Sequence, residues 1–438
     1  MTRAERLAQA PRPDPLEGPP PEPPPEPRQG PRPLPLHLMA ASLAWTSSRA
    51  GLPLLNSASP PWRPEVQSAA AALQASLEKV DPEAFQGAVE RQLHARMAAL
   101  AEGILSYRRH PYRRRLPDPP VLWRQGTTRL LDYGAGRSGG QARRSAPPVL
   151  VVPSLINRGY ILDLAEDRSL MRWLAAEGLR PILVDWGRPG PEERAFTFTD
   201  YIAGRLEDAL DAAIAETGAR PLLVGYCMGG LLALALALRR QGDLDGLALL
   251  ATPWDFHAEG GVQGALAAAA LPALAPLMEA CGELPVDSIQ SLFASLDPQL
   301  VARKFVAFSG LDPASPKAAA FVALEDWLND GVPLAAPVAR ECLGGWYGEN
   351  TPARGTWRIA GRPVDPSRLA LPSLCVIPAQ DRIVPPASAR ALAEMIPGTE
   401  TMTPTLGHIG MVVSAGAGER VWRPLRDWLA ARAGAAER

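Results

Sequence analysis

Short apolar runs alternate with segments of helical periodicity over much of this chain, and this alternation most limits what it can fold into. In the helical segments apolar residues recur three or four positions apart, as at Leu206, Leu210 and Ile214. Strands separated by helices pair in parallel and are covered on both faces. The pattern therefore predicts an α/β fold with a mostly parallel sheet. The runs expected as its strands are residues 149–153, 182–186, 222–225, 247–251, 373–377 and 399–403.

Residues 255–365 interrupt this alternation, and their pattern is mostly helical. Helical periodicity also fills residues 64–107, where Asp81-Pro82-Glu83 is a helix start signal. The basic segment 108–115 that follows is interpreted as a solvated turn, with a phosphate contact as the alternative. The expected organisation is a disordered Pro-rich tail over 1–36, an N-terminal helical extension over 37–118, an α/β core over 119–254 and 366–438, and a helical cap or lid inserted over 255–365.

Composition excludes several classes of function. The 45 Lys and Arg residues balance 46 Asp and Glu residues, so no global electrostatic binding of nucleic acid is expected. The longest apolar run, 262–278, contains Pro272 and Pro276, which are expected to break it, and no transmembrane segment is predicted. The chain has no GxGxxG after a strand, Walker A loop, HExxH or CxxC, so neither a cofactor nor a metal is expected. Its four cysteines give no disulfide scaffold, which favours a reducing, cytoplasmic location.

The strongest local signal is Gly225-Tyr226-Cys227-Met228-Gly229-Gly230, which joins an apolar strand to an apolar helix. This context is typical of a nucleophile elbow, a sharp turn that presents a nucleophile at the start of a helix. A helix N-terminus favours an anion, and the thiolate is the reactive form of cysteine. Cys227 is therefore the candidate nucleophile; the alternative is a small buried core residue.

A nucleophile of this kind needs a base, and the base needs an orienting acid. In this architecture the chain order is nucleophile, acid, histidine. His408 lies in a glycine-flanked loop after the last expected strand and is the candidate base, with His257 as the weaker alternative. Asp381 follows the strand expected over 373–377 and is the candidate acid, and Asp255 is the backup acid.

Backbone N–H groups are expected to stabilise the oxyanion that forms during acyl transfer. One should belong to Met228, directly after the nucleophile. The other should come from the loop 154–158 after the first core strand. The sequence does not single out a donor within that loop, and Ile156 at its centre is taken as the candidate.

At this point the chain resembles the polyhydroxyalkanoate (poly-3-hydroxybutyrate) synthase family, in which a Cys replaces the Ser of the lipase box. The resemblance covers about residues 120–432, and several of its motifs are similar to the class III catalytic subunit. The motifs are Gly225-Tyr226-Cys227-Met228-Gly229-Gly230, residues 152–164, Glu166-Asp167-Arg168-Ser169, Val184-Asp185-Trp186-Gly187, Asp200-Tyr201-Ile202, Thr252-Pro253-Trp254-Asp255-Phe256, residues 381–386 and Gly407-His408-Ile409-Gly410-Met411. The Pro-rich tail and the helical segment over 64–107 make the chain longer than a typical class III subunit.

This resemblance implies an α/β-hydrolase-like polymerase that joins (R)-3-hydroxyacyl-CoA thioesters into a polyester and releases CoA. Cys227 would carry the acyl group as a thioester, His408 would deprotonate Cys227 and the incoming hydroxyl, and Asp381 would orient His408 or assist with the hydroxyl. It also implies cytoplasmic polyester granules, with a second synthase subunit or a homodimer as partner.

Two other functions stay open at this stage. The same scaffold could serve a CoA thioesterase, an acyltransferase with a small acceptor or a polyester depolymerase, because residues 255–365 set the access of water and acceptor. A third hypothesis, from another class, is a catalytically idle granule-associated binding protein.

Overall fold

The computed structural model describes residues 27–50, 63–134, 146–260 and 262–433. Its centre is an eight-stranded sheet in the order β1-β2-β6-β3-β7-β8-β13-β14. The hairpin strands β1 and β2 pair antiparallel, β2 also pairs antiparallel with β6, and all other neighbours are parallel. The strands are β1 (Val121–Gln125), β2 (Thr128–Asp132), β3 (Pro148–Val152), β6 (Arg180–Asp185), β7 (Leu222–Tyr226), β8 (Gly246–Leu250), β13 (Ser373–Val376) and β14 (Glu400–Met402).

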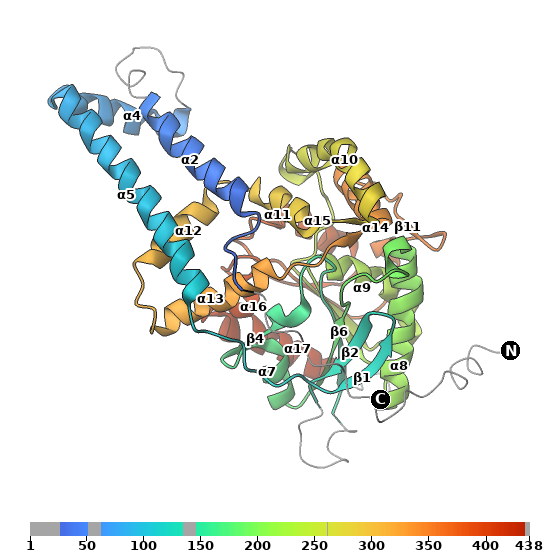
Figure 1. Ribbon diagram of the computed structural model, residues 1–438. Coiled ribbons are helices and arrows are strands. Elements are labelled where there is room, and N and C mark those ends of the chain that lie inside the picture. The colour runs from blue at the N-terminus through green and yellow to red at the C-terminus, as the bar shows by residue number, and fades with distance from the viewer. Residues whose placement is uncertain (1–26, 51–62, 135–145, 261, 434–438) are drawn as a thin grey trace.

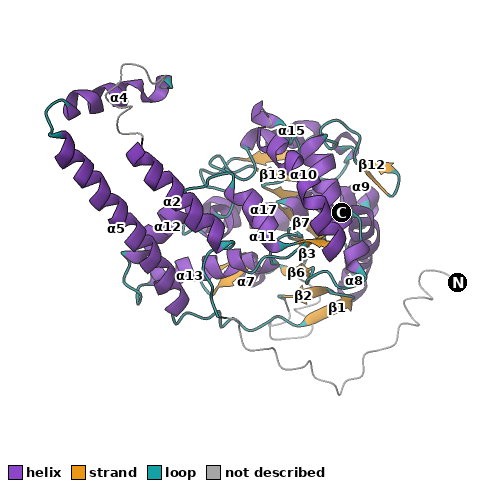
Figure 2. Ribbon diagram, turned by 45° about the horizontal axis from the view of Figure 1, so that its top comes forward, coloured by secondary structure: helices purple, strands orange, loops and turns teal. Residues whose placement is uncertain are grey.

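Helices cover both faces of this sheet, as Figures 1 and 2 show. The apolar core on one face includes side chains of α8, α9 and α15, and the core on the other includes side chains of α7, α16 and α17. The predicted α/β fold with a mostly parallel sheet is therefore confirmed. The helices are α7 (Leu170–Ala176), α8 (Glu207–Thr217), α9 (Met228–Arg239), α15 (Pro386–Met395), α16 (Gly410–Val413) and α17 (Arg423–Arg432), and a two-stranded ribbon, β4 (Asp163–Ala165) and β5 (Arg168–Ser169), precedes α7.

The insertion over 255–365 divides into two groups. One group surrounds the cavity at the carboxyl ends of the strands, and all its members except α14 contribute lining residues. It consists of α10 (Val262–Cys281), β9 (Glu283–Leu284), α11 (Val286–Ala294), β10 (Leu334–Ala335), α14 (Ala336–Arg340) and a π-helix (Glu341–Gly348). The other group, α12 (Leu300–Ser309) and α13 (Pro316–Asn329), packs side chains against α5. A small hairpin, β11 (Arg358–Ile359) and β12 (Arg362–Pro363), ends the insertion. The expected cap is therefore only part of this segment.

The apolar run at the start of the insertion forms one helix. The expectation that Pro272 and Pro276 break it is wrong, because α10 continues through both. Each proline removes one backbone N–H, and the remaining turns still close. Judged by length and composition alone, α10 is the one helix of the described residues able to cross a membrane, and 11% of its window Gly264–Cys281 is buried. The prediction that the chain has no segment suited to cross a membrane is therefore corrected for α10, by length and composition only.

The N-terminal helices form an arm that projects from the body (Figure 1). They are α2 (Leu34–Ala50), α4 (Pro64–Leu77) and α5 (Pro82–Arg109). The start signal of α5 acts as predicted, since the Asp81 carboxylate accepts a 2.9 Å bond from the N–H of Ala84. Only the last third of α5 is buried, where Leu100, Ile104 and Tyr107 meet α12.

The segment that leads into α2 is packed against the body. The boundary of the disordered tail at residue 36 is corrected for residues 27–36, because Arg28 binds the Asp326 carboxylate at 2.6 Å and the carbonyl oxygens of His110 and Tyr112. Residues 1–26 lie outside the described part of the chain. The basic segment 108–115 also makes structural contacts: Arg114 binds the fully buried carboxylate of Asp163 at 2.7 Å.

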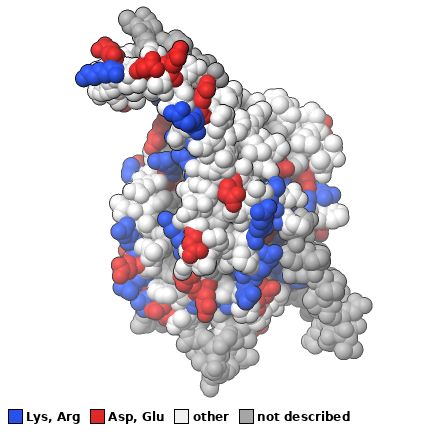
Figure 3. Space-filling model, turned by 60° about the vertical axis from the view of Figure 1, so that its left-hand side comes forward, with Lys and Arg blue, Asp and Glu red and all other residues white. Residues whose placement is uncertain are grey.

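Charges on the face drawn in Figure 3 are of both signs and interspersed. No single-signed area dominates that face, which agrees with the balanced composition.

Candidate active site

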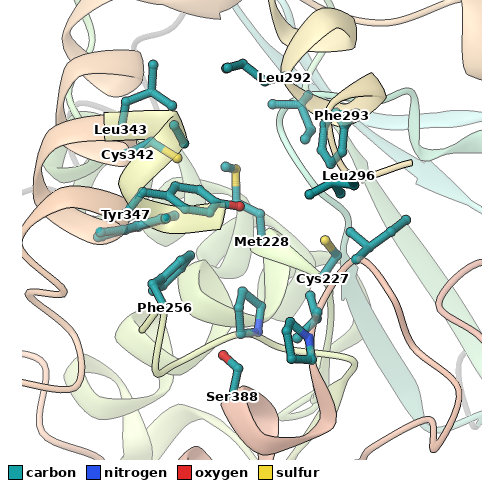
Figure 4. Close-up of a pocket in the computed structure, with 18 of the residues that line it drawn as sticks. Cys227, Met228, Phe256, Leu292, Phe293, Leu296, Cys342, Leu343, Tyr347 and Ser388 are labelled. Atoms are coloured by element: carbon teal, nitrogen blue, oxygen red, sulfur yellow. The ribbon is translucent and has the colours of Figure 1, made fainter. Parts of the chain in front are cut away.

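Cys227 lies at the sharp turn between β7 and α9, with φ 56° and ψ −129°. A non-glycine residue adopts this conformation only where the surroundings enforce it. The first turn of α9 has no room for side chains at Gly229 and Gly230. A Cβ on Gly229 would lie 2.2 Å from the carbonyl oxygen of Val152, and one on Gly230 would lie 1.9 Å from Oγ1 of Thr252. The glycines thus let α9 pack directly on the sheet, and the turn presents the Cys227 side chain to the cavity (Figure 4).

The structure brings Asp381 and His408 together from two different loops. Nδ1 of His408 lies 2.6 Å from Oδ2 of Asp381, and both residues are buried. The other carboxylate oxygen of Asp381 accepts the N–H groups of Ile383 at 2.8 Å and Val384 at 2.9 Å. Because all these partners are fixed in place, the carboxylate holds the imidazole in one orientation.

His408 also has Cys227 as a hydrogen-bond partner, and its ring lies against Tyr226 with centroids 5.3 Å apart. Burial lowers the pKa of His408, but the charge of the Cys227 thiolate and the bonds to Asp381 and Cys227 outweigh burial and raise it to about 10. The surroundings of His408 therefore favour its protonated form. With Nδ1 on Asp381, Nε2 is the nitrogen that faces the sulfur.

The two expected oxyanion donors both line the same cavity as Cys227. Met228 is the first residue of α9, and an N–H in a first helical turn has no partner inside the helix. The N–H of Ile156 lies 3.3 Å from Oγ of Ser154, while its carbonyl oxygen accepts the N–H of Val332. The Ile156 backbone is thereby fixed between the sheet and the insertion.

The backup acid and the weaker candidate base lie apart from this pair. Asp255 lines the cavity, but its Oδ1 accepts bonds from Asn350 at 2.8 Å and from the N–H of His257 at 2.9 Å. The ring of His257 is exposed and its Nε2 lies 2.8 Å from the carbonyl oxygen of Tyr347. The partner of His408 in the structure is Asp381.

The cavity in front of Cys227 is mostly apolar. Figure 4 shows α11 side chains on one side of the cavity and the π-helix on the other, with Cys227 on the same side as Leu296. His408 and Asp381 are not among the residues that line it. Apolar lining residues that sequence reasoning did not single out are Phe256, Leu284, Ile289, Leu292, Phe293, Leu296, Leu343 and Trp346.

These residues carry no local signal of function, because apolar residues at helical spacing are indistinguishable from core residues.

Within residues 27–50, 63–134, 146–260 and 262–433, no three His, Cys, Asp or Glu side chains are grouped to hold a metal ion. The absence of a cofactor stays a prediction.

Comparison with known proteins gives two independent likenesses. The model of the alpha/beta hydrolase fold family matches residues 147–415. The poly(3-hydroxyalkanoate) polymerase subunit PhaC of Haloferax mediterranei is 29% identical over 317 residues, which are 71% of this chain and 63% of that protein. The proteins of the same name from Synechocystis sp. and Allochromatium vinosum are 31% and 30% identical, over 65% and 69% of this chain and 78% and 85% of their own lengths. The chain thus spans less than two thirds of the first relative and more than three quarters of the other two.

Proposed function

This chain belongs to the alpha/beta hydrolase fold family and, within it, to the poly(3-hydroxyalkanoate) polymerases, and we propose that it builds polyester from (R)-3-hydroxyacyl-CoA on Cys227. Its α/β-hydrolase-like fold agrees with that membership. The observation that carries the proposal is the arrangement of Cys227, His408 and Asp381 in line, with the sulfur facing an apolar cavity.

Loading of the acyl group is the first half of the proposed cycle. The Cys227 sulfur gives its proton to Nε2 of His408 and attacks the thioester carbonyl carbon. The oxyanion that forms accepts bonds from the N–H of Met228 and from the 154–158 loop, with Ile156 as the candidate donor. The carbon–sulfur bond to CoA then breaks, and the departing thiolate takes the proton from His408. One thioester replaces another, so this step is close to thermoneutral.

Chain extension is the second half. The hydroxyl of a further (R)-3-hydroxyacyl-CoA attacks the Cys227 thioester and gives its proton to His408. An ester bond forms, the bond to the Cys227 sulfur breaks, and the lengthened chain is held on CoA. That chain reloads Cys227 and releases CoA, as in the first half. A thiolate leaves more readily than a serine alkoxide, which suits repeated transfer to an alcohol.

The apolar cavity supports transfer to an alcohol over hydrolysis. Side chains from α11 and the π-helix line the space in front of Cys227. An apolar lining of this kind offers water few hydrogen-bond partners beside the acyl-enzyme. An acyl chain can occupy the same surface without losing hydrogen bonds.

We further propose a cytoplasmic enzyme that works at the surface of a polyester granule, with a second synthase subunit or a second copy as partner. The outward side of α10 supports the granule. Its exposed residues include Leu266, at 58% exposure, and Leu277, at 39%, and the window Gly264–Cys281 contains one charged residue, Glu279. A helix that is apolar on its outward side favours contact with an apolar surface. The related proteins of Synechocystis sp. and Allochromatium vinosum are named polymerase subunits, which supports a partner chain.

The test is to supply (R)-3-hydroxybutyryl-CoA and measure released CoA, free 3-hydroxybutyrate and solvent-extractable polyester together. We expect CoA and polyester to rise in step and free acid to stay low. A Cys227→Ala control should release no CoA above background. CoA with only free acid would establish a thioesterase instead, and CoA with a small ester would establish an acyltransferase. An inactive wild-type protein that still binds polyester would support the non-catalytic hypothesis.

A further inference from the structure

One polar group in the cavity has no role in the proposed cycle. Oxygen-bearing side chains that line the cavity, within the described part of the chain, are Asp255, Glu259, Ser295, Tyr347 and Ser388. Four of them are engaged or lie in solvent: Asp255 accepts the Asn350 amide, Ser295 donates to the Leu292 carbonyl oxygen at 2.6 Å, Ser388 accepts the N–H of Trp254, and Glu259 is exposed. The Tyr347 hydroxyl makes no hydrogen bond with another of the described residues.

The setting of Tyr347 fixes where that hydroxyl points. Its ring packs edge-on against Phe256 with centroids 4.8 Å apart, and its carbonyl oxygen lies 2.8 Å from Nε2 of His257. In Figure 4 the ring reaches from the π-helix toward the middle of the cavity, and its oxygen ends near Met228, facing the side where Cys227 lies. Burial, with the charges of Cys342 and Cys227, raises the pKa of Tyr347, so the hydroxyl keeps its proton.

An acyl group on Cys227 would bring one further oxygen into this space. A 3-hydroxyacyl thioester carries its carbonyl oxygen at the oxyanion donors and a second oxygen on C3, two carbons further along the chain. That second oxygen is a hydroxyl in the monomer and an ester oxygen in a growing chain. A buried oxygen without a partner is strongly disfavoured, and the remaining lining of the cavity is mostly apolar. His408 is not among the residues that line this cavity.

We propose that Tyr347 donates a hydrogen bond to the C3 oxygen of the acyl group on Cys227 and thereby selects 3-oxygenated acyl groups over plain acyl groups. This inference rests on the proposed function and names a specificity-determining residue for it. The C3 oxygen can accept a hydrogen bond from the Tyr347 hydroxyl both as a hydroxyl and as an ester oxygen, so Tyr347 can bind both a monomer and a growing chain.

The test compares (R)-3-hydroxybutyryl-CoA with butyryl-CoA, which lacks only the C3 oxygen. The rate of CoA release in a single turnover is measured for wild type, Tyr347→Phe and the control Tyr112→Phe. Tyr112 lies in the N-terminal connection, outside the cavity, and its hydroxyl likewise has no hydrogen-bond partner within the described part of the chain. We expect Tyr347→Phe to lower the rate for the hydroxylated substrate about fivefold to tenfold and to leave the butyryl rate within about twofold. Tyr112→Phe should change neither.

Equal losses on both substrates would mean that Tyr347 is structural, and no loss on either would also overturn the inference. A selectivity loss in Asp255→Asn but not in Tyr347→Phe would assign the C3 oxygen to Asp255. A second readout does not need turnover: calorimetric affinities of the two CoA thioesters are measured for Cys227→Ala with and without Tyr347→Phe. Tyr347→Phe should narrow the difference between the affinity for (R)-3-hydroxybutyryl-CoA and the affinity for butyryl-CoA. A wild type that polymerises while Tyr347→Phe keeps full selectivity contradicts this inference alone, and a wild type that makes no polymer contradicts the proposed function.

Discussion

Replacing Asp381 by Asn separates orientation from mere proximity at the active site. Oδ1 of Asp381 accepts two backbone N–H groups and Oδ2 faces Nδ1 of His408. An Asn side chain would keep its oxygen on the backbone N–H groups and turn its NH₂ group toward His408. Two donors cannot pair, so Nδ1 would become the acceptor and the proton would move to Nε2. In that neutral tautomer Nε2 already carries a proton, so it cannot take the proton of Cys227.

The size of the effect follows from that change of tautomer. In triads of this geometry the same substitution lowers kcat about 10,000-fold, and we expect Asp381→Asn to slow CoA release from (R)-3-hydroxybutyryl-CoA about 1,000- to 10,000-fold. The matched control is Asp255→Asn. Asp255 also lines the cavity, but its Oδ1 acceptor survives in Asn, so its rate should stay within about tenfold of wild type.

Single-turnover CoA release, measured with the thermal unfolding midpoint of each variant, is the assay. The reasoning about His408 would be refuted if Asp381→Asn kept more than about a tenth of the wild-type rate. Equal losses in the two variants would refute it as well, since Asp255 has no contact with His408. An unchanged unfolding midpoint shows that the loss is catalytic.

Three further predictions concern the turn, the imidazole and the arm. Gly229→Ala should lower the free energy of unfolding by about 1–3 kcal/mol, because its Cβ would overlap a carbonyl oxygen of β3. The control is Gly242→Ala, whose Cβ meets no atom within 4 Å and which should change the free energy of unfolding by less than about 0.5 kcal/mol. Urea titrations measure both variants, and equal effects would contradict this reasoning. The pKa of His408 is raised from 6.5 to about 10, so its charged form stabilises the fold fully below about pH 6.5 and this contribution is lost as the pH rises through about 10. Cys227→Ala should lower that pKa in an NMR titration of the imidazole, since Cys227 is one of the groups that raise it; an unchanged pKa would contradict the pairing of Cys227 with His408. Arg28→Ala should expose the start of α2 to limited proteolysis, since four hydrogen bonds of the guanidinium are lost, and a wild-type cleavage pattern would show that other contacts hold this segment.

The core of the fold could be predicted from the sequence because its signals are local. The strand expected over 222–225 and the glycines around Cys227 specify a turn that needs little information from elsewhere in the chain. The loop position of His408 and its distance along the chain from Asp381 are also readable, and the structure has their side chains 2.6 Å apart.

The errors arose where distant parts of the chain decide the outcome. No local feature of the sequence indicates that Arg28 binds Asp326, 298 residues away. The disordered Pro-rich tail was therefore predicted to extend to residue 36. Pro272 and Pro276 were expected to break the apolar run, but α10 continues through both. Tyr347 has no motif, and its place in the cavity depends on how the π-helix packs over Cys227.

The central claim, that the acyl group is carried on the sulfur of Cys227, is tested most directly by mapping the acyl-enzyme. Butyryl-CoA can load the enzyme but has no hydroxyl with which to extend a chain, so the loaded form should accumulate. After acid quenching and proteolysis, peptide mass spectrometry should find one butyryl group on the peptide that contains Cys227 and none on those with Cys281, Cys342 or Cys375. CoA release with the acyl group on any other residue, or on none, would contradict the claim.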